Sequence, residues 1–518
     1  MKTQGRSGNA ALTIILVFLS TSVVLSQKNN KNGFSGKADL YKAKKSALEY
    51  LSDSSIVEKY GNISDLIWNY AELGMQEFKS SALLIKALEE EGFKVEKGIA
   101  GMPTCFIATW GNGKPVIGIL GEFDALPMLS QKPLTSVKDP LIPGAPGHGC
   151  GHNMMGTAGI AAAIAVKKSM ETDDIPGTIK FFGSPAEEIT ISRPYMVNAG
   201  VFKDVDAVID NHASTNLSTR YGISGNALVS VVYSFSGKTA HAGSDPWNGR
   251  SALDAVEVMN VAVNFLREHI YYTSRIHYVI TEGGGAPNVV PDKASVWYYI
   301  RNTDDNLEGT FSRVTDCARG AAIATGTKLD TVMVITAIHQ KHSSKGMAEI
   351  LQKNIELVGL PEWTENEQIF AKSLQRSLGV EEKGFPSELN ILKEPTAVQT
   401  DGASTDVGDV SLVTPVATLN FPGGVPGISG HHWSTVTCGF GPAAWKGLNA
   451  GAKVMAATML DLLTKPELLG AIRNEFFEYS GKHQFKSFLP EGAKPPIDMN
   501  REMMDKYRNA MMNNIPDE

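Results

Sequence analysis

The sequence is poor in cysteine, has no run of basic residues, and contains no long hydrophobic stretch. It has 518 residues, of which four are cysteine, and a formal net charge of −7 at pH 7. Without clustered lysine or arginine, an acidic chain offers no electrostatic surface for nucleic acid or for a membrane. With 42% hydrophobic and 20% charged residues the composition is ordinary for a globular protein, so a small molecule is the expected ligand.

The apolar stretch near the N-terminus, residues 10–19, is too short to span a bilayer comfortably. Lys2 and Arg6 precede it, and small residues follow it up to Ser26. This pattern is typical of a secretory signal peptide over residues 1–26, so we expect an exported protein, periplasmic or extracellular. A retained anchor is the weaker interpretation, and no cysteine follows the segment to accept a lipid.

Helical and strand patterns alternate beyond residue 38. Short runs rich in β-forming residues occupy 104–110, 116–121, 178–183 and 205–210. Helical periodicity marks 45–51, 63–73, 80–91 and about 153–170. This alternation predicts an α/β fold with a mostly parallel sheet flanked by helices. In such sheets, ligands bind beyond the carboxyl ends of the strands.

Residues 222–338 depart from this alternation and have the predicted order strand, helix, strand, strand, helix, strand. This is the ferredoxin-like pattern, and it is complete in itself, so it predicts an inserted domain. We therefore expect a catalytic domain in two parts, 38–221 and 339–485, around this insertion. Residues 486–518 are expected to form a C-terminal tail, of which 486–500 crosses the surface in an extended conformation.

A glycine-rich turn carries Cys150 and His152, two residues apart. On an extended or turning backbone both side chains can reach one ion, whereas on a helix they would point apart. A small buried cysteine would be the simpler interpretation of Cys150 alone. Other candidate ligands follow predicted strands and converge on one crevice: Glu122, Asp124, Glu187, Glu188 and His212. If Cys150 binds metal, the four cysteines allow at most one disulfide.

Cys150, His152, Glu188, His212 and one C-terminal histidine would supply the sulfur, nitrogen and oxygen ligands that suit zinc or another divalent transition ion. Five ligands exceed the need of one closed site, so a pair of ions sharing a water is expected. Of the adjacent glutamates we expect Glu188 to bind metal and Glu187 to take the proton from that water. An acidic pair at a helix N-terminus is the alternative. Four histidines are expected in loops or on the surface: His148, His277, His339 and His342.

Seven motifs in order resemble a known family. They are GEFDALP (121–127), PGHGCGHN (146–153), PAEE (185–188), AHAGSDPWNGRSALDAVE (240–257), APNVVPD (286–292), STDVGDVS (404–411) and GHHWS (430–434). Together they are similar to the dinuclear metallo-aminoacylase and carboxypeptidase family of zinc-peptidase-like amidohydrolases, and within it to the p-aminobenzoyl-glutamate hydrolase-like proteins of the B-subunit type. The resemblance implies a metal-dependent enzyme that cleaves the amide bond of an N-acyl amino acid. It also implies two divalent ions, Zn or Mn, and a metal-activated water as the nucleophile.

The resemblance assigns roles to residues of this chain. It implies Glu187 as general base and Asp124 as the group that orients a ligand imidazole. The implied metal ligands are Cys150, His152, Glu188, His212 and His431. Glu122 stands where members with all-histidine sites carry a ligand, and Asn153 stands where related enzymes carry aspartate, so the role of Glu122 stays open and Asn153 is not counted as a ligand.

The resemblance also implies that the inserted domain serves as a lid and dimerisation domain. It implies that His241 reaches into the partner subunit's site to stabilise the developing oxyanion, and that Asn288 and Arg301 hold the substrate. A solvated cation at a strand end is the alternative for Arg301. The implied assembly is a homodimer, and a complex with a related subunit is left open.

Other functions remain open at this point. A dipeptidase or an N-acyl-amino-acid deacylase would use the same machinery, and the choice depends on pocket geometry. Outside the enzymes, a non-catalytic metal-binding protein could keep the fold, although it would have no need for Glu187 and His241. A closed structural metal site is disfavoured by the surplus of ligands.

Overall fold

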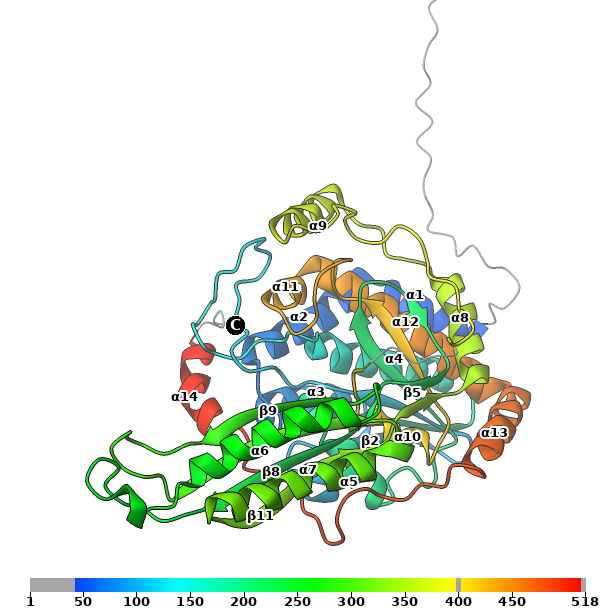
Figure 1. Cartoon of the computed structure of the whole chain (residues 1–518). Coiled ribbons are helices and arrows are strands. Elements are labelled where there is room, and N and C mark those ends of the chain that lie inside the picture. The colour runs from blue at the N-terminus through cyan, green and yellow to red at the C-terminus, as the bar shows by residue number, and fades with distance from the viewer. Residues whose placement is uncertain (1–41, 397–401, 514–518) are drawn as a thin grey trace, which may run out of the picture.

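The computed structural model describes residues 42–396 and 402–513. These residues build a seven-stranded sheet and a four-stranded sheet, each with its own helices, and a two-stranded ribbon (Figure 1). The predicted signal peptide of residues 1–26 lies outside the described residues. Within 42–396 and 402–513, no helix is both long enough and apolar enough to cross a membrane.

The seven-stranded sheet has the strand order β1-β2-β4-β3-β5-β13-β6. Its central neighbours β4, β3, β5 and β13 run parallel, and β1, β2 and β6 add antiparallel edges. The predicted mainly parallel sheet is therefore confirmed at the centre. The strands are β1 (Lys94–Lys97), β2 (Phe106–Asn112), β3 (Val116–Gly121), β4 (Gly177–Gly183), β5 (Ala207–Ser214), β6 (Ser218–Thr219) and β13 (Val416–Pro422).

Helices cover both faces of this sheet, which explains why β3 is buried along its whole length. Among the helices that share one core with it are α1 (Lys42–Ser52), α2 (Ser54–Tyr70), α3 (Phe78–Glu90), α4 (His152–Asp173), α8 (Lys345–Val358) and α12 (Pro442–Thr464). The short helices α5 (Ser192–Asn198) and α10 (Val407–Ser411) belong to a second core. The remaining helices are α9 (Glu365–Ser377), α11 (Trp433–Cys438), α13 (Pro466–Ser480) and α14 (Arg501–Met512).

The four-stranded sheet is antiparallel with the order β11-β8-β10-β9, and α6 and α7 cover one of its faces (Figure 1). Its elements are β8 (Ala227–Ser236), α6 (Ala252–Leu266), β9 (Arg275–Glu282), β10 (Lys293–Asn302), α7 (Asp304–Thr325) and β11 (Lys328–Ile338). They follow the predicted order and enclose a core of their own. The chain enters and leaves this unit through the paired strands β7 (Gly222–Ser224) and β12 (Lys341–Ser343). The boundaries at 222 and 338 stay a prediction.

The C-terminal tail has no helix or strand between residues 486 and 500 and then forms α14. This helix was not predicted, because its pattern contains only two buried residues, Met504 and Met511, within a polar sequence. Arg508 of α14 pairs with the buried Glu72 at the end of α2. The tail is thus attached to the catalytic unit by specific contacts.

Candidate active site

A cleft of about 660 Å³ lies between the two sheets. One side, which we call the ligand side, carries Glu122, Cys150, Glu187, Glu188, His212 and His431. The opposite side, the arginine side, carries Arg275, His277, Tyr299 and Arg301 from β9 and β10. The ligand side gathers residues at the carboxyl ends of β3, β4 and β5, where an α/β sheet is expected to bind its ligand.

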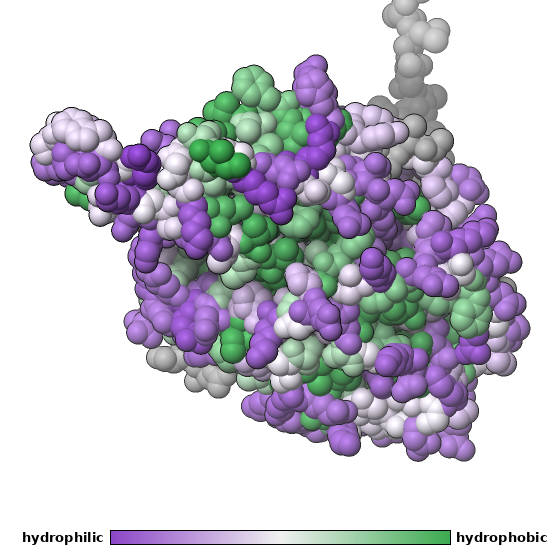
Figure 2. Space-filling model, turned by 60° about the horizontal axis from the view of Figure 1, so that its bottom comes forward, coloured by the Kyte–Doolittle hydropathy of each residue, from purple (hydrophilic) through white to green (hydrophobic). Residues whose placement is uncertain are grey.

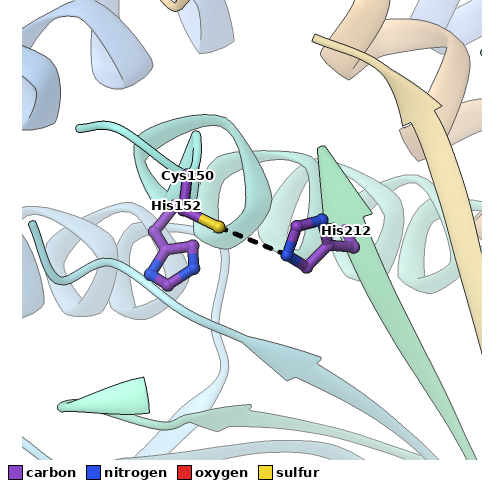
Figure 3. A group of neighbouring side chains, drawn as sticks. All are labelled: Cys150, His152 and His212. Atoms are coloured by element: carbon purple, nitrogen blue, oxygen red, sulfur yellow. Dashed lines mark hydrogen bonds between the residues drawn. The ribbon is translucent and has the colours of Figure 1, made fainter. Parts of the chain in front are cut away.

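The Cys150 side chain points toward His212, and His152 lies beside Cys150 (Figure 3). Between them, Gly151 has a φ of 81°, a left-handed conformation that glycine adopts without strain, and α4 begins at His152. His212 lies near the end of β5, inside the strand rather than after it. The Cys150 Sγ is 3.4 Å from the His212 Nε2. The turn therefore brings the predicted cysteine and histidine to one point.

Asp124 holds two of the predicted ligands. Its Oδ1 is 2.8 Å from the Nδ1 of His152, and its Oδ2 accepts a hydrogen bond of 2.9 Å from the backbone N–H of Glu188. A carboxylate that accepts a hydrogen bond from Nδ1 fixes the imidazole so that its Nε2 faces the site. Metal-binding histidines are commonly held in this way. This geometry is the one expected of an orienting residue.

Glu187 and Glu188 follow Ala186, which is held at a φ of 58°. Glu77, completely buried beneath this turn, accepts a 2.8 Å hydrogen bond from the Ala186 N–H. The Glu188 Oε2 is 3.3 Å from the Nε2 of His431, and the Glu187 Oε2 is 3.9 Å from the Nε2 of His152. Both carboxylates thus face the cleft, and the division of their roles stays a prediction.

Of the two adjacent C-terminal histidines, His431 lines this cleft. Its neighbour His432 caps α11, where its Nδ1 accepts from the backbone N–H of Ser434. The arrangement agrees with His431, rather than His432, as the fifth candidate ligand.

The chemistry of these residues fits divalent metal ions. Three overlapping groups have ligand atoms within 4.8 Å of one another: Cys150 with His152 and His212, Cys150 with Glu188 and His431, and Glu122 with His152 and Glu187. In these groups, three buried atoms have no hydrogen-bond partner among the described residues: Glu122 Oε2, His152 Nε2 and Glu188 Oε1. Buried polar atoms are rarely left without partners, and an ion would supply one.

The electrostatics of the site also favour divalent metal ions. Burial, with the nearby Asp124 and Glu122 charges, raises the pKa of Glu188 to about 8. Burial also raises the pKa of Glu187, and it raises the pKa of the Cys150 thiol to about 12. Without a cation these groups favour their neutral forms, whereas a divalent ion would stabilise the carboxylates and the thiolate.

On the arginine side, β9 and β10 place residues in opposed pairs: Arg301 faces Arg275, and Tyr299 faces His277. The guanidinium of Arg301 lies 5.5 Å from the centre of the Tyr299 ring. His277 was expected in a loop or on the surface. It is exposed on β9, and it also lines the cleft, which the sequence analysis did not predict.

His241 and Asn288 do not line the cleft of their own chain. Both are exposed, in neighbouring loops joined by a bridge between His241 and Val289. The Nδ1 of His241 accepts hydrogen bonds of 3.1 Å from the N–H groups of Gly243 and Ser244. The structure therefore brings these two predicted substrate-binding residues together, but away from the ligand side.

Arg193 was missed by the sequence analysis. Its guanidinium is completely buried between two carboxylates, 2.7 Å from Glu122 Oε1 and paired with Asp406. A single arginine in a helical segment gives no sequence signal of such a role, although Asp406 lies in one of the seven motifs. His148 and His339 were expected in loops or on the surface. Both lie in loops, where they are buried: His148 contacts the Ile67 carbonyl, and His339 contacts Asp409. All four cysteines are free thiols.

Comparison with known proteins agrees with this geometry. Residues 118–513, more than half of the chain, match the peptidase family M20/M25/M40. The chain is 36% identical to one of the subunits of p-aminobenzoyl-glutamate hydrolase from Escherichia coli (strain K12), with 85% of this chain and 96% of that protein covered. It is 29% identical to an Xaa-Arg dipeptidase of Mus musculus, covering 86% and 94%.

A solved structure has the same fold. It is the YXEP protein of Bacillus subtilis, described as a dinuclear metal-binding peptidase of the M20 family, with a TM-score of 0.51, 17% identity, and coverage of 80% of this chain and 100% of that one. The matched family spans the ligand side and the arginine side alike. This chain belongs to the peptidase family M20/M25/M40 and is a metal-dependent hydrolase of amide or peptide bonds.

Proposed function

We propose that this protein hydrolyses the amide bond of an N-acyl amino acid with an acidic side chain, of the p-aminobenzoyl-glutamate type. The observation that carries this proposal is the pairing of Arg275 with Arg301 across the cleft from the candidate metal ligands. The E. coli relative, which is named for p-aminobenzoyl-glutamate hydrolysis, supports the same substrate class.

The two arginines lie directly opposite each other on neighbouring strands, an arrangement that is unfavourable for like charges. No carboxylate among the described residues forms an ion pair with either of them. Burial lowers the pKa of Arg301, so its charge is incompletely solvated. Carboxylates of a bound substrate would offset both effects, and guanidinium groups bind carboxylates through paired hydrogen bonds.

On the ligand side, Glu187 is the proposed general base. Its carboxylate borders the cleft, and burial raises its pKa, which suits a group that takes a proton from water and returns it to the leaving amine. Two divalent ions, zinc or manganese, held by Cys150, His152, Glu188, His212 and His431, would lower the pKa of the attacking water and polarise the amide carbonyl. Arg301 and Arg275 would hold the carboxylates of the amino-acid product.

We further propose a homodimer in which His241 and Asn288 complete the partner's site. Their exposure and their absence from their own cleft support this assignment. The face of the molecule in Figure 2 is mostly hydrophilic and also carries hydrophobic patches. On the insertion, α6 exposes Val261 and Phe265, and the edge strand β9 exposes Val279 and Ile280, as an interface would require. Because the E. coli relative is named as one subunit of a hydrolase whose other subunit is also similar to this chain, a second, related subunit is a further candidate partner.

Export is proposed from residues 1–26 alone. The mature chain is then expected to begin near Gln27 and to be located in the periplasm or outside the cell. N-terminal sequencing of the protein isolated from its source would test this, and a mature chain that begins at Met1 would contradict it.

A dipeptidase or N-acyl-amino-acid deacylase is the second candidate. The 29% identical Xaa-Arg dipeptidase favours it, since the same ligand set would serve both reactions. A p-aminobenzoyl-glutamate hydrolase and an Xaa-Arg dipeptidase would prefer opposite charges on the amino-acid side chain of the substrate. A pair of arginines attracts a glutamate side chain and repels an arginine side chain.

The experiment compares metal-loaded protein on p-aminobenzoyl conjugates of glutamate, alanine and arginine. We expect the highest kcat/KM for glutamate. Arg275→Met should lower this value by about 10- to 150-fold, the equivalent of a charge-assisted hydrogen bond, and should change the value for alanine by less than about threefold. Faster hydrolysis of the arginine conjugate would support the dipeptidase, and no hydrolysis of any amide would refute both candidates.

A further inference from the structure

Glu122 is a buried carboxylate at the end of β3 whose two oxygens have different surroundings. Its side chain is 2% exposed. Oε1 lies 2.7 Å from the Arg193 guanidinium, whereas Oε2 has no hydrogen-bond partner among the described residues. The unpartnered oxygen points to the Nε2 of His152, at 3.2 Å. That nitrogen is also buried and lacks a hydrogen bond.

The Glu122 Oε2 and the His152 Nε2 require a cation or a proton between them. The Nδ1 of His152 is committed to Asp124, so a neutral imidazole carries its proton there and presents a lone pair at Nε2. A carboxylate oxygen also presents only lone pairs. Two such atoms at 3.2 Å repel each other, unless a cation or a proton lies between them.

The separation agrees with two ligands of one ion. Zinc binds histidine nitrogen at about 2.0–2.1 Å and carboxylate oxygen at about 2.0–2.2 Å. Around one ion, ligands at these distances are separated by about 2.9 Å at a right angle and by about 3.4 Å at the tetrahedral angle. The observed 3.2 Å between the Glu122 Oε2 and the His152 Nε2 lies within this range.

Arg193 gives Glu122 a fixed orientation. The guanidinium is completely buried and binds both Glu122 and Asp406, and Asp406 also accepts from the backbone N–H of Arg193 at 3.1 Å. A buried arginine between two carboxylates stabilises their charged forms and locks the Glu122 side chain with Oε2 toward the site.

We propose that Glu122 is a further metal ligand, which binds the same ion as His152 and is held in position by Arg193. This inference rests on the proposed two-ion site. Its alternative is a protonated His152 that forms an ion pair with Glu122 and needs no metal. The two assignments differ in where Glu122 lies once metal is bound.

The direct test is a diffraction experiment on wild-type protein loaded with zinc, in which anomalous scattering locates the ions. An ion within about 2.0–2.3 Å of the Glu122 Oε2 would support the proposal. An ion more than about 3 Å from that oxygen would overturn it and leave the proposed function intact. Protein that binds no ion at all would overturn the two-ion site together with this inference.

A second test uses Glu122→Gln with Asp406→Asn as the matched control, because each removes one carboxylate from Arg193. Chelator competition should show that Glu122→Gln binds one of two ions at least 10-fold more weakly, and its Co²⁺-loaded form should have an altered visible absorption spectrum. Asp406→Asn should keep the wild-type cobalt spectrum. Unchanged affinity and spectrum in Glu122→Gln, or the same change in both variants, would show that Glu122 acts only through Arg193.

Discussion

The two sides of the cleft differ in how their residues are held. On the ligand side, Asp124 and His152 are almost completely buried and bonded to each other. On the arginine side, Arg275 and His277 are exposed, and no described carboxylate forms an ion pair with Arg301. Buried polar groups must satisfy one another or share an ion, so their geometry is fixed before substrate arrives. Exposed groups can change with little cost in stability. The difference fits the proposed assignment of the chemistry to the ligand side and of substrate choice to the arginine side.

The largest effect is expected from removal of a proposed metal ligand. Cys150→Ala and Glu188→Ala should each lower the metal content and abolish most activity together, since both residues border the same candidate ions. Elemental analysis of the purified variants beside a turnover assay measures both quantities. Full metal content in both variants would mean that the ligand side has been misassigned.

Glu187→Gln should separate chemistry from metal binding. The amide is isosteric but cannot take a proton, and a general base typically contributes about 10²–10⁴-fold to turnover. We therefore expect a loss of kcat in that range with normal metal content. A variant with near-normal rate would require a different base.

His241→Ala tests whether the insertion acts across the dimer. Loss of one oxyanion donor usually costs about 10²–10³ in turnover. In a mixed dimer of His241→Ala with Glu187→Gln, one site carries both defects, and the other combines an intact base with the partner's intact histidine. Subunit exchange should restore up to half of the activity per mixed dimer. Verified mixed dimers without recovery would place His241 outside the partner's site.

The sequence predicted the elements whose signal is local. An aliphatic run ending in glycine predicted β3 at its observed bounds, 116–121, and the order of the inserted elements was also right. Residues whose role depends on distant partners were missed. Arg193 acts through Glu122 and Asp406, which are far away in the sequence, and His277 depends on the direction of an edge strand. Only the fold reveals such positions.

The C-terminal tail also contacts the segment that holds the loops of the ligand side. Arg508 of α14 binds the Glu72 carboxylate and donates to the Gln76 carbonyl at 3.2 Å. The Glu72 carbonyl accepts from the N–H of Ala125, the neighbour of Asp124. In the same segment, Glu77 holds the turn before Glu187. The segment 72–77 therefore connects the tail to the two loops that carry Glu187 and Asp124.

Arg508→Met is expected to have the smallest effect on activity and a clear effect on stability. Glu72 is 1% exposed, and it would keep its hydrogen bonds from Ser80 but lose its counter-charge, so we expect a loss of about 1–3 kcal/mol in the free energy of unfolding. Turnover should fall by about 3- to 10-fold, below the 10² that a misplacement of about an ångström costs. Arg501→Met is the matched control, since Arg501 pairs with Asp498 on the surface of the same helix and should contribute less than about 1 kcal/mol.

The pH dependence of the stability lost in Arg508→Met shows whether Arg508 acts through its charge or through packing. Burial raises the pKa of Glu72 above its ordinary value, while Ser80 and Arg508 lower it. Without Arg508 the folded-state pKa rises further, so ionisation of Glu72 costs stability as the pH rises through that value. As the pH falls below it the penalty shrinks, and it disappears below the ordinary pKa of glutamate in the unfolded chain. Denaturant unfolding should therefore show that Arg508→Met lowers the free energy of unfolding, relative to wild type, by more at pH 8 than at pH 5. Arg508→Lys should recover part of this loss. An equal deficit at both pH values would mean that Arg508 stabilises the tail by packing, and that the ligand side does not depend on this ion pair.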